Sequence, residues 1–269
     1  MIYVTGDTHG DMLARFTPAS MPGEDTWGPG DKLIVLGDFG LIFYPETELF
    51  LDKLALEEQK KAFLEQKPYE ILFIDGNHEN FDRLAAYPEE TRWGGPVRRI
   101  GRNIFWLQRG RIYTIEDRTF FCMGGAYSLD KPGRLAKERE FFLYYPDQPE
   151  LRLLWWPQEL PDDAQYKTAE RSLVANGRKV DYVLSHTCPT SLIYEMRRVP
   201  DMHDGELTGF LDWIWHEIGF EHWYFGHWHI DETVHPRATA LYFGVVRVGG
   251  DGGIRLSAGE EEKDENGDL

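Results

Sequence analysis

The stretch Phe73-Ile-Asp-Gly-Asn-His-Glu79 places three polar side chains directly after an apolar run. The run, Ile71 to Ile74, has the length and composition of a buried β-strand, and Gly76 interrupts it abruptly. Open α/β sheets carry their binding and catalytic groups at the carboxyl ends of the strands. The polar residues Asn77 to Glu79 are therefore predicted to lie at a functional edge of such a sheet.

Four other apolar runs end in the same way, each with a candidate metal ligand just behind it. They are followed by Gly6-Asp-Thr-His9, Gly37-Asp38, Ser185-His186 and Gly226-His-Trp-His229. In the first and last of these, alternate residues of an extended chain point the same way, so each can present two groups to one centre. Each motif alone is common, but five strand ends carrying such residues are not easily explained as ordinary turns.

The chemistry of these side chains predicts a metal centre. Carboxylate, imidazole and amide oxygen together suit Mn, Fe, Zn, Ni or Co better than Ca or Mg. One tetrahedral ion needs fewer ligands than this set offers, whereas two divalent ions that share a bridging carboxylate would use all of them. The candidate ligands are Asp7, His9, Asp38, Asn77, His186, His227 and His229.

The order of apolar and polar segments predicts an α/β fold with a parallel sheet. Strands are expected at 2–5, 32–36, 71–74, 180–184, 223–225 and 241–248. Helices are expected at 11–16, 46–66, 80–86, 163–176 and 205–218, and Asp162 or Asp163 is expected to cap the fourth. Residues 103–108, 111–115 and 118–123 are interpreted as three strands of an antiparallel meander. The apolar stripe expected on the helix at 46–66 consists of Leu49, Leu54, Leu56, Phe63 and Leu64.

Length and composition favour one domain over residues 1–255, followed by an acidic, disordered tail at 256–269. The net charge is −17, which makes long duplex nucleic acid an unfavourable partner. The sequence has no apolar run of about 18 residues and no secretory signal pattern, so neither a membrane span nor export is expected. Its two cysteines cannot build a disulfide framework, and a cytoplasmic location is expected. No feature of the sequence predicts an oligomeric state.

Residues 126–161, rich in aromatic residues and proline, are expected to be an irregular insertion. The insertion is either a loop packed on the surface or a wall of the substrate site. Within it, Lys131 and Arg134 could clamp a phosphate or could be solvated loop charges. Tyr127 could stack on a base, although core packing is the simpler role for an aromatic residue.

Taken together, Gly6-Asp-Thr-His9, Gly37-Asp38, Gly76-Asn-His-Glu79, His186 and Gly226-His-Trp-His229 resemble the motifs of the calcineurin-like metallophosphoesterase superfamily. The resemblance covers residues 2 to about 248 and is nearest to an uncharacterised bacterial and phage branch. It implies a four-layer α/β/β/α sandwich with two mixed β-sheets.

The same resemblance implies the roles of the site residues. Asp7, His9 and His229 would hold one metal ion, and Asn77, His186 and His227 the other, with Asp38 as the bridge. His78 would face the scissile phosphate and protonate the leaving oxygen after attack by a metal-bridging hydroxide. Manganese is the favoured metal.

The sequence departs from the phosphoserine/threonine phosphatase branch, which has Asp-Arg-Gly where this chain has Leu41-Ile-Phe43. The orienting partner of His78 is therefore open, with Glu79, Asp82 and Asp130 as candidates. The expected function is hydrolysis of a small phosphomonoester or phosphodiester, with a nucleotide as one option. The alternatives are a nuclease for short or single-stranded nucleic acid and a catalytically silent metal-binding scaffold.

Overall fold

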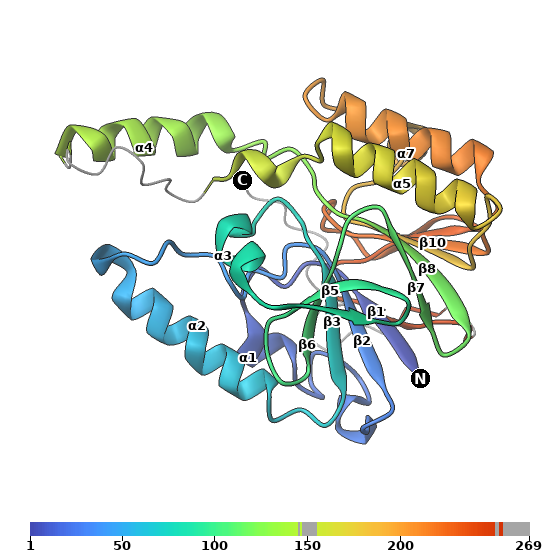
Figure 1. The fold of residues 1–269 in the computed structure, drawn as a ribbon, viewed down its shortest axis with the longest axis horizontal. Helices are drawn as coiled ribbons and strands as arrows, with labels where there is room; N and C mark the ends of the chain where they lie inside the picture. Colours follow the sequence, from blue (N-terminus) through green and yellow to red (C-terminus); the bar gives the residue numbers. More distant parts are fainter. Residues whose placement is uncertain (145, 147–154, 251–252, 255–269) are drawn as a thin grey trace.

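Two mixed β-sheets packed face to face form the centre of the molecule, with helices on the outer face of each (Figure 1). The computed structural model describes residues 1–144, 146, 155–250 and 253–254. The predicted α/β class with two mixed sheets is confirmed. The acidic tail predicted at 256–269 lies outside the described residues.

The first sheet has seven strands, of which β1, β2, β3 and β6 are parallel neighbours, and the other three each pair antiparallel with the strand before them in the sheet towards either edge. Its spatial order is β13 (Val245–Arg247), β1 (Ile2–Thr5), β2 (Lys32–Leu36), β3 (Glu70–Ile74), β6 (Ile104–Leu107), β5 (Gly95–Arg99) and β4 (Glu89–Arg92).

The second sheet has six strands and a similar arrangement. Its four central strands, β8, β9, β10 and β12, are parallel, and one antiparallel strand lies at each edge. Its order is β11 (Glu232–His235), β12 (Ala238–Ala240), β10 (His222–Phe225), β9 (Tyr182–Ser185), β8 (Arg118–Met123) and β7 (Arg111–Ile115).

Alternating side chains of each central strand enter different hydrophobic cores, which is why these strands are apolar throughout. In β1, Ile2 and Val4 pack between the two sheets, whereas Tyr3 faces the outer helices. In β10, Tyr224 packs between the sheets, and Trp223 faces the helices on the other side. The three cores account for the four layers.

Helices α1 (Met12–Arg15), α2 (Leu51–Leu64) and α3 (Phe81–Ala86) cover the first sheet, and α5 (Asp163–Ala175), α6 (Thr190–Glu195) and α7 (Gly205–Glu217) cover the second. Short 3₁₀ turns lie at Glu24–Thr26, Glu48–Phe50 and Pro157–Glu159. Asp162 caps α5 in a capping box with Gln165, as one of the two predicted alternatives required. Within the described residues, no helix combines the length and apolarity needed to cross a bilayer.

The structure corrects two of the predictions about the secondary structure. Residues 103–108 do not join a meander, because β6 pairs with β3 and β5 in the first sheet while β7 and β8 pair in the second. The chain changes sheets at Arg109, whose buried guanidinium binds Asp75. The apolar stripe of α2 is correct only at its end. Leu64 and Phe63 pack on the core, whereas Leu49 and Leu56 are exposed and the other buried residue of the helix is Glu57.

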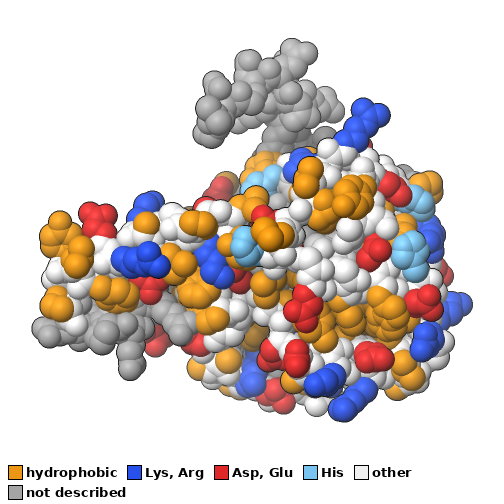
Figure 2. All heavy atoms as spheres, turned by 90° about the horizontal axis from the view of Figure 1, so that it is seen from above, with side chains coloured by type: hydrophobic (Ala, Val, Ile, Leu, Met, Phe, Trp, Pro, Cys, Tyr) orange, Lys and Arg blue, Asp and Glu red, His pale blue; other side chains and the backbone are white. Residues whose placement is uncertain are grey.

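The insertion predicted as irregular contains a regular helix, α4 (Lys131–Tyr144). This helix buries none of its residues and extends away from the sheets as an arm (Figures 1 and 2). Its sequence lacks the apolar stripe by which a packed helix is recognised, and Leu143 and Tyr144 near its end are exposed. The α4 arm stands opposite α2, and the two helices enclose a cleft.

Candidate metal centre

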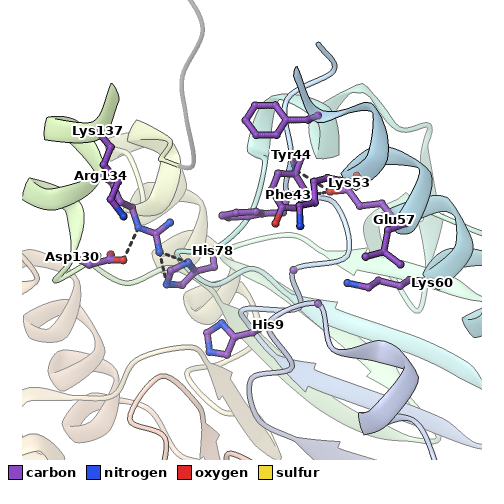
Figure 3. Close-up of a pocket in the computed structure, with 14 residues that line it drawn as sticks. His9, Phe43, Tyr44, Lys53, Glu57, Lys60, His78, Asp130, Arg134 and Lys137 are labelled. Atoms are coloured by element: carbon purple, nitrogen blue, oxygen red, sulfur yellow. Dashed lines mark hydrogen bonds and ion pairs between the residues drawn. The ribbon is translucent and has the colours of Figure 1, made fainter. Parts of the chain in front are cut away.

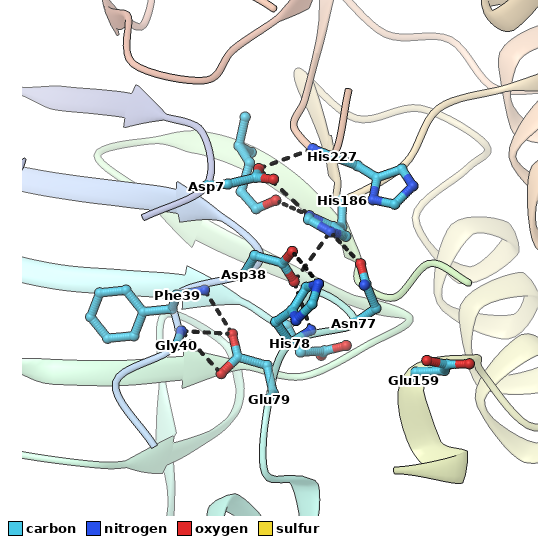
Figure 4. Close-up of polar contacts among 12 residues, drawn as sticks. Asp7, Asp38, Phe39, Gly40, Asn77, His78, Glu79, Glu159, His186 and His227 are labelled. Atoms are coloured by element: carbon cyan, nitrogen blue, oxygen red, sulfur yellow. Dashed lines mark hydrogen bonds and ion pairs between the residues drawn. The ribbon is translucent and has the colours of Figure 1, made fainter. Parts of the chain in front are cut away.

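The carboxyl ends of β1, β2, β3, β9 and β10 meet at one place, where the two sheets come together (Figure 4). The first three strands belong to the seven-stranded sheet and the last two to the six-stranded sheet. The loop after β1 and the loop after β10, which lie near opposite ends of the sequence, therefore present their side chains to one another. Three overlapping groups of possible metal ligands result, with ligand atoms within 4.8 Å of one another: Asp7–His9–His229, His9–Asp38–His78 and Asp7–Asp38–His186.

The first group converges on a carboxylate oxygen. The Nε2 atoms of His9 and His229 are 3.0 Å apart, and the Nε2 of His229 is 3.2 Å from Asp7 Oδ2. That oxygen is buried and has no hydrogen-bond partner among the described residues. A buried carboxylate oxygen without a partner is costly. The arrangement therefore calls for a cation between these three side chains.

A second convergence lies around His186, which is fully buried. Its Nδ1 donates to the carbonyl of Leu36 at 2.7 Å, a contact that directs Nε2 inwards. Nε2 lies 3.1 Å from Asn77 Oδ1, and Asn77 is held in this orientation because its Nδ2 donates to Ser128 Oγ at 3.0 Å. With the ring neutral, two acceptors would face each other, so this position also demands a proton or a metal ion.

The pKa of His186 also indicates that a positive charge is favoured at this position. Burial alone would lower the pKa of this imidazole, but the carboxylates of Asp38 and Asp7 raise it to about 10. By contrast, burial and the neighbouring His186 lower the pKa of His227 to about 3, so its ring is neutral and has a lone pair to offer. The two rings lie 5.0 Å apart, centroid to centroid.

Asp38 occupies the middle of the site. One of its oxygens is 3.4 Å from His186 Nε2 and the other is 3.8 Å from His9 Nδ1. Burial opposes the charged form, but the imidazoles of His186 and His78 hold the pKa of this carboxyl well below its usual range. Asp38 is therefore an anion placed between the two groups of histidines.

The backbone at these loops is strained in a way that marks a functional site. His9, Asp38, His227 and His229 all adopt positive φ angles, between 45° and 68°, which side chains other than glycine rarely do. Such conformations persist only where surrounding contacts hold them, as when the amide of His227 donates to Asp7 Oδ1 at 2.9 Å.

The glycines of the motifs supply space for the ligands. A methyl group at Gly76 would overlap Asp38 Oδ1, and one at Gly226 would overlap Asp7 Oδ1. Gly76 does not have a positive φ angle, so close approach and not a sharp turn explains the glycine at this position. The unpartnered Asp7 oxygen, the facing acceptors and these fitted glycines together show that the residues present fit a centre of divalent cations.

His78 lies beside this centre and is bound by Arg134 of the α4 arm. Arg134 Nη2 is 2.9 Å from His78 Nδ1, and Arg134 Nε donates to Asp130 Oδ2 at 2.7 Å. Because a guanidinium can only donate, Nδ1 accepts and the ring proton lies on Nε2, which is 3.9 Å from Asp38 Oδ2. Of the three partners considered from the sequence, Asp130 is connected to His78, and this connection runs through Arg134.

Glu79 has a different role. It is fully buried and accepts hydrogen bonds from the amides of Phe39 and Gly40, which follow Asp38. Burial and the nearby Asp38 raise the pKa of this carboxyl well above its usual range. Glu79 thereby ties the loop after β3 to the loop after β2. The third candidate partner of His78, Asp82, accepts from Gln158 instead.

The three residues predicted to contact substrate are placed separately. Arg134 reaches the centre, whereas Lys131 pairs with Glu159 at 3.0 Å and lies over the ring of Trp155. Tyr127 stacks on His203 at 4.5 Å and borders a smaller cavity of about 300 Å³ on the His227 side. Ser128, which orients Asn77, was not predicted as a site residue, because only the fold brings its hydroxyl to the amide of Asn77.

Leu41 and Ile42, which stand where a phosphatase branch has polar residues, are buried in the core on the outer face of the first sheet. Phe43, the next residue, is half-buried and borders the large cavity in front of His9 and His78. The loop after β2 therefore supplies an aromatic wall in place of a phosphate clamp.

The comparison with protein families agrees with this geometry. The family model of the calcineurin-like phosphoesterases matches residues 1–231. A search of curated proteins finds no match. Among solved structures, the chain is similar to the phosphopantetheinyl hydrolase PptH from Mycobacterium tuberculosis, with 17% identity and a TM-score of 0.38 over 90% of this chain and 87% of that one. The match over residues 1–231, together with the motifs gathered at the strand ends, shows that this chain belongs to the calcineurin-like phosphoesterase family.

Proposed function

We propose that this protein is a metal-dependent hydrolase of small phosphate esters. The observation that carries the proposal is the convergence of Asp7, Asp38 and the histidines at neighbouring strand ends on positions that demand cations. A purely structural network would be expected to satisfy its buried oxygens, whereas Asp7 Oδ2 has no hydrogen-bond partner in the part of the chain described.

The proposed ligands divide into two sets that share one carboxylate. Asp7, His9 and His229 would hold one ion, Asn77, His186 and His227 would hold the other, and Asp38 would be shared between them. We propose Mn²⁺ as the metal to test first, followed by Fe, Zn, Ni and Co, since this mixture of nitrogen and oxygen donors suits them. When bound, such a pair supplies a water molecule activated as a nucleophile and positive charge that stabilises the phosphoryl oxygens.

Protonation of the leaving group and binding of the phosphate are assigned to His78 and Arg134. The Nε2–H of His78 faces the centre, where it can donate to the leaving oxygen of the ester. The oxygens of a bound phosphate would compete with His78 for the guanidinium of Arg134. Release of Nδ1 would then let the ring carry the second proton that a general acid needs, while Arg134 holds the phosphate.

The test is reconstitution of the metal-free protein with each metal in turn, with metal content measured alongside turnover. Hydrolysis of p-nitrophenyl phosphate is compared with that of bis-p-nitrophenyl phosphate, a monoester against a diester with the same leaving group. We expect close to two ions per chain and turnover of at least one ester.

Two different results would contradict this proposal, and each identifies another function. A chain that binds no metal and cleaves neither ester would be a scaffold. Strong preference for the diester, together with cleavage of short single-stranded oligonucleotides, would identify a nuclease instead. Addition of a chelator should abolish turnover, and readdition of the metal should restore it.

A further inference from the structure

The cleft between α2 and the α4 arm contains a cavity of about 690 Å³ that opens directly onto His9 and His78 (Figure 3). Its walls come from the loop after β2, from α2 and from α4. A cavity of this volume is typical of sites that hold a whole small molecule. A phosphate group at the metal centre would leave most of it free, so the cavity has room for what is attached to that phosphate.

The charge of the cavity is opposite to that of the protein. Four basic residues line it, Lys53, Lys60, Arg134 and Lys137, against two acidic ones, Glu57 and Asp130. The whole chain has a net charge of −17, so this gathering of cations is a local feature. A concave site lined by one sign of charge attracts ligands of the opposite sign.

Both acidic residues are already engaged. Glu57 is buried, accepts from the amides of Phe43 and Tyr44 at 2.8 Å each, and pairs with Arg83 at 2.6 Å. Asp130 pairs with Arg134. Among the described residues, no carboxylate pairs with Lys53, Lys60 or Lys137. Three ammonium groups are therefore free to bind an anion.

These cations occupy two levels of the cleft. On α2, Lys60 lies next to Gly10 and His9, whereas Lys53 is seven residues nearer the outer end, about 10 Å along the helix axis. On α4, Arg134 contacts His78, and Lys137 lies one turn farther along the arm. Lys60 and Arg134 thus form an inner level beside the proposed metal centre, and Lys53 and Lys137 form an outer level.

Aromatic side chains join the two levels. The ring of Phe43 is 6.2 Å from that of His78, and Tyr44 lies 5.4 Å from both Phe43 and Phe50. All three aromatic residues line the cavity, and Lys53 Nζ lies 5.9 Å from the centre of the Tyr44 ring. Such a wall can stack on a planar ring, a contact that favours nucleobases without regard to their identity.

We propose that the α2–α4 cleft is the leaving-group subsite and that it takes a leaving group with both a planar ring and a second anionic group, the chemistry of a nucleotide with a further phosphate. This inference rests on the proposed phosphoesterase function. The scissile phosphate is held at the inner level, the ring stacks on Tyr44 and Phe50, and the second anion is held by Lys53 and Lys137.

Four monoesters separate the two recognition features. Glycerol 3-phosphate has neither feature, 3-phosphoglycerate has the charge, adenosine 5′-monophosphate has the ring, and adenosine 3′,5′-bisphosphate has both. With metal-loaded protein, we expect kcat/KM to rise about tenfold for each feature, the usual effect of one charge-assisted hydrogen bond or one stacked base. Equal rates, or a preference for glycerol 3-phosphate, would overturn the proposal.

Variants of residues that line the cavity test which side chains recognise the second anion and the ring. Lys53→Gln should remove about tenfold from kcat/KM for the two substrates with a second anion and leave the other two unchanged. The matched control is Lys61→Gln on the same helix, because Lys61 contacts Tyr87 outside the cavity. Tyr44→Ala should remove the advantage of the two adenosine substrates. Lys53→Gln behaving like Lys61→Gln would contradict the assignment of the outer level.

Binding separates a failed subsite from a failed enzyme. Adenosine 3′-monophosphate, the ring-bearing and anionic product alcohol, should bind more tightly than adenosine by calorimetry, and Lys53→Gln should weaken that binding about tenfold. Such binding without turnover of any ester would refute the phosphoesterase function but keep the subsite. Turnover of the simple esters without this binding preference would refute the subsite and keep the function.

Discussion

The metal centre and the α2–α4 cleft adjoin each other but are built on opposite plans. In the centre, the ligands stand on the ends of central strands around the buried carboxylates of Asp7 and Asp38, and glycines that touch these carboxylates leave no room for an added side chain. In the cleft, the side chains stand on two helices, one of which buries none of its residues. The metal centre keeps its ligands in place although several of their backbone conformations are strained, whereas the cleft presents charged side chains that solvent already surrounds.

This difference indicates where substitutions should abolish chemistry and where they should change preference. A metal ligand at a strand end is held in place by the surrounding backbone, by close glycines and by hydrogen bonds, so its replacement disturbs all of these contacts. A lysine on α2 has few such neighbours, so its replacement costs one interaction with the ligand. The four predictions below test this contrast, beginning with the largest expected effect.

Asp38→Asn should lower turnover on the order of a thousandfold and should reduce the number of bound ions, because the anion between the two histidine groups is removed. Metal content by mass spectrometry and kcat/KM on the same samples measure both effects. Asp117→Asn, in the exposed turn between β7 and β8, is the matched control and should change neither. Full metal content in Asp38→Asn would show that the carboxylate is not the bridge.

His78→Ala should lower kcat about a hundredfold while both ions remain bound, since His78 is proposed to act on the leaving oxygen and not on the metal. The effect should be smaller for p-nitrophenyl phosphate than for an alkyl ester, because p-nitrophenolate needs less protonation as it leaves. Loss of metal from His78→Ala would assign this residue to the ligands and refute its proposed role.

Gly76→Ala should weaken metal binding about tenfold although every ligand is retained, because the added methyl group overlaps Asp38 Oδ1. Gly28→Ala is the matched control, since a methyl group at that position meets nothing within 4 Å. Metal titration of the two variants measures the difference. Equal affinities would mean that the centre tolerates movement of Asp38, and the contrast with the cleft would be lost.

The smallest effect is expected at His222, at the amino end of the strand whose carboxyl end leads to His227. Burial, with a contribution from His235, lowers the pKa of His222 to about 4. The unfolded chain therefore binds a proton here before the folded one, so stability is full above about pH 6.5 and falls as the pH drops towards 4.

Urea unfolding of the wild type and His222→Gln at pH 7.5 and pH 5 measures this loss. The variant should lose less stability than the wild type, by about 1 kcal/mol once the partial exposure of the ring is discounted. An identical pH dependence in the two proteins would show that His222 does not contribute. Metal content should be unchanged in the variant, unlike the variants at the opposite end of the strand.

Much of the fold followed from local pattern. The strands that precede the candidate ligands were predictable because both of their faces are buried, which makes them apolar throughout. The pairing of β6 was not, because Ile104–Leu107 is equally apolar in either sheet and the change of sheet depends on Arg109 reaching Asp75. The α4 arm escaped prediction because it packs on nothing that would impose an apolar stripe.

The family, the candidate ligands and the strand ends that carry them could be predicted from the sequence, because these depend on residue types at short spacing. The surroundings of the Phe73-Ile-Asp-Gly-Asn-His-Glu79 turn became known only from the folded chain. Glu79 binds the loop after β2, Gly76 leaves space for Asp38, and His78 is linked to Asp130 through an arginine 56 residues away. These contacts join segments whose spacing along the chain contains no period, so no local pattern could reveal them.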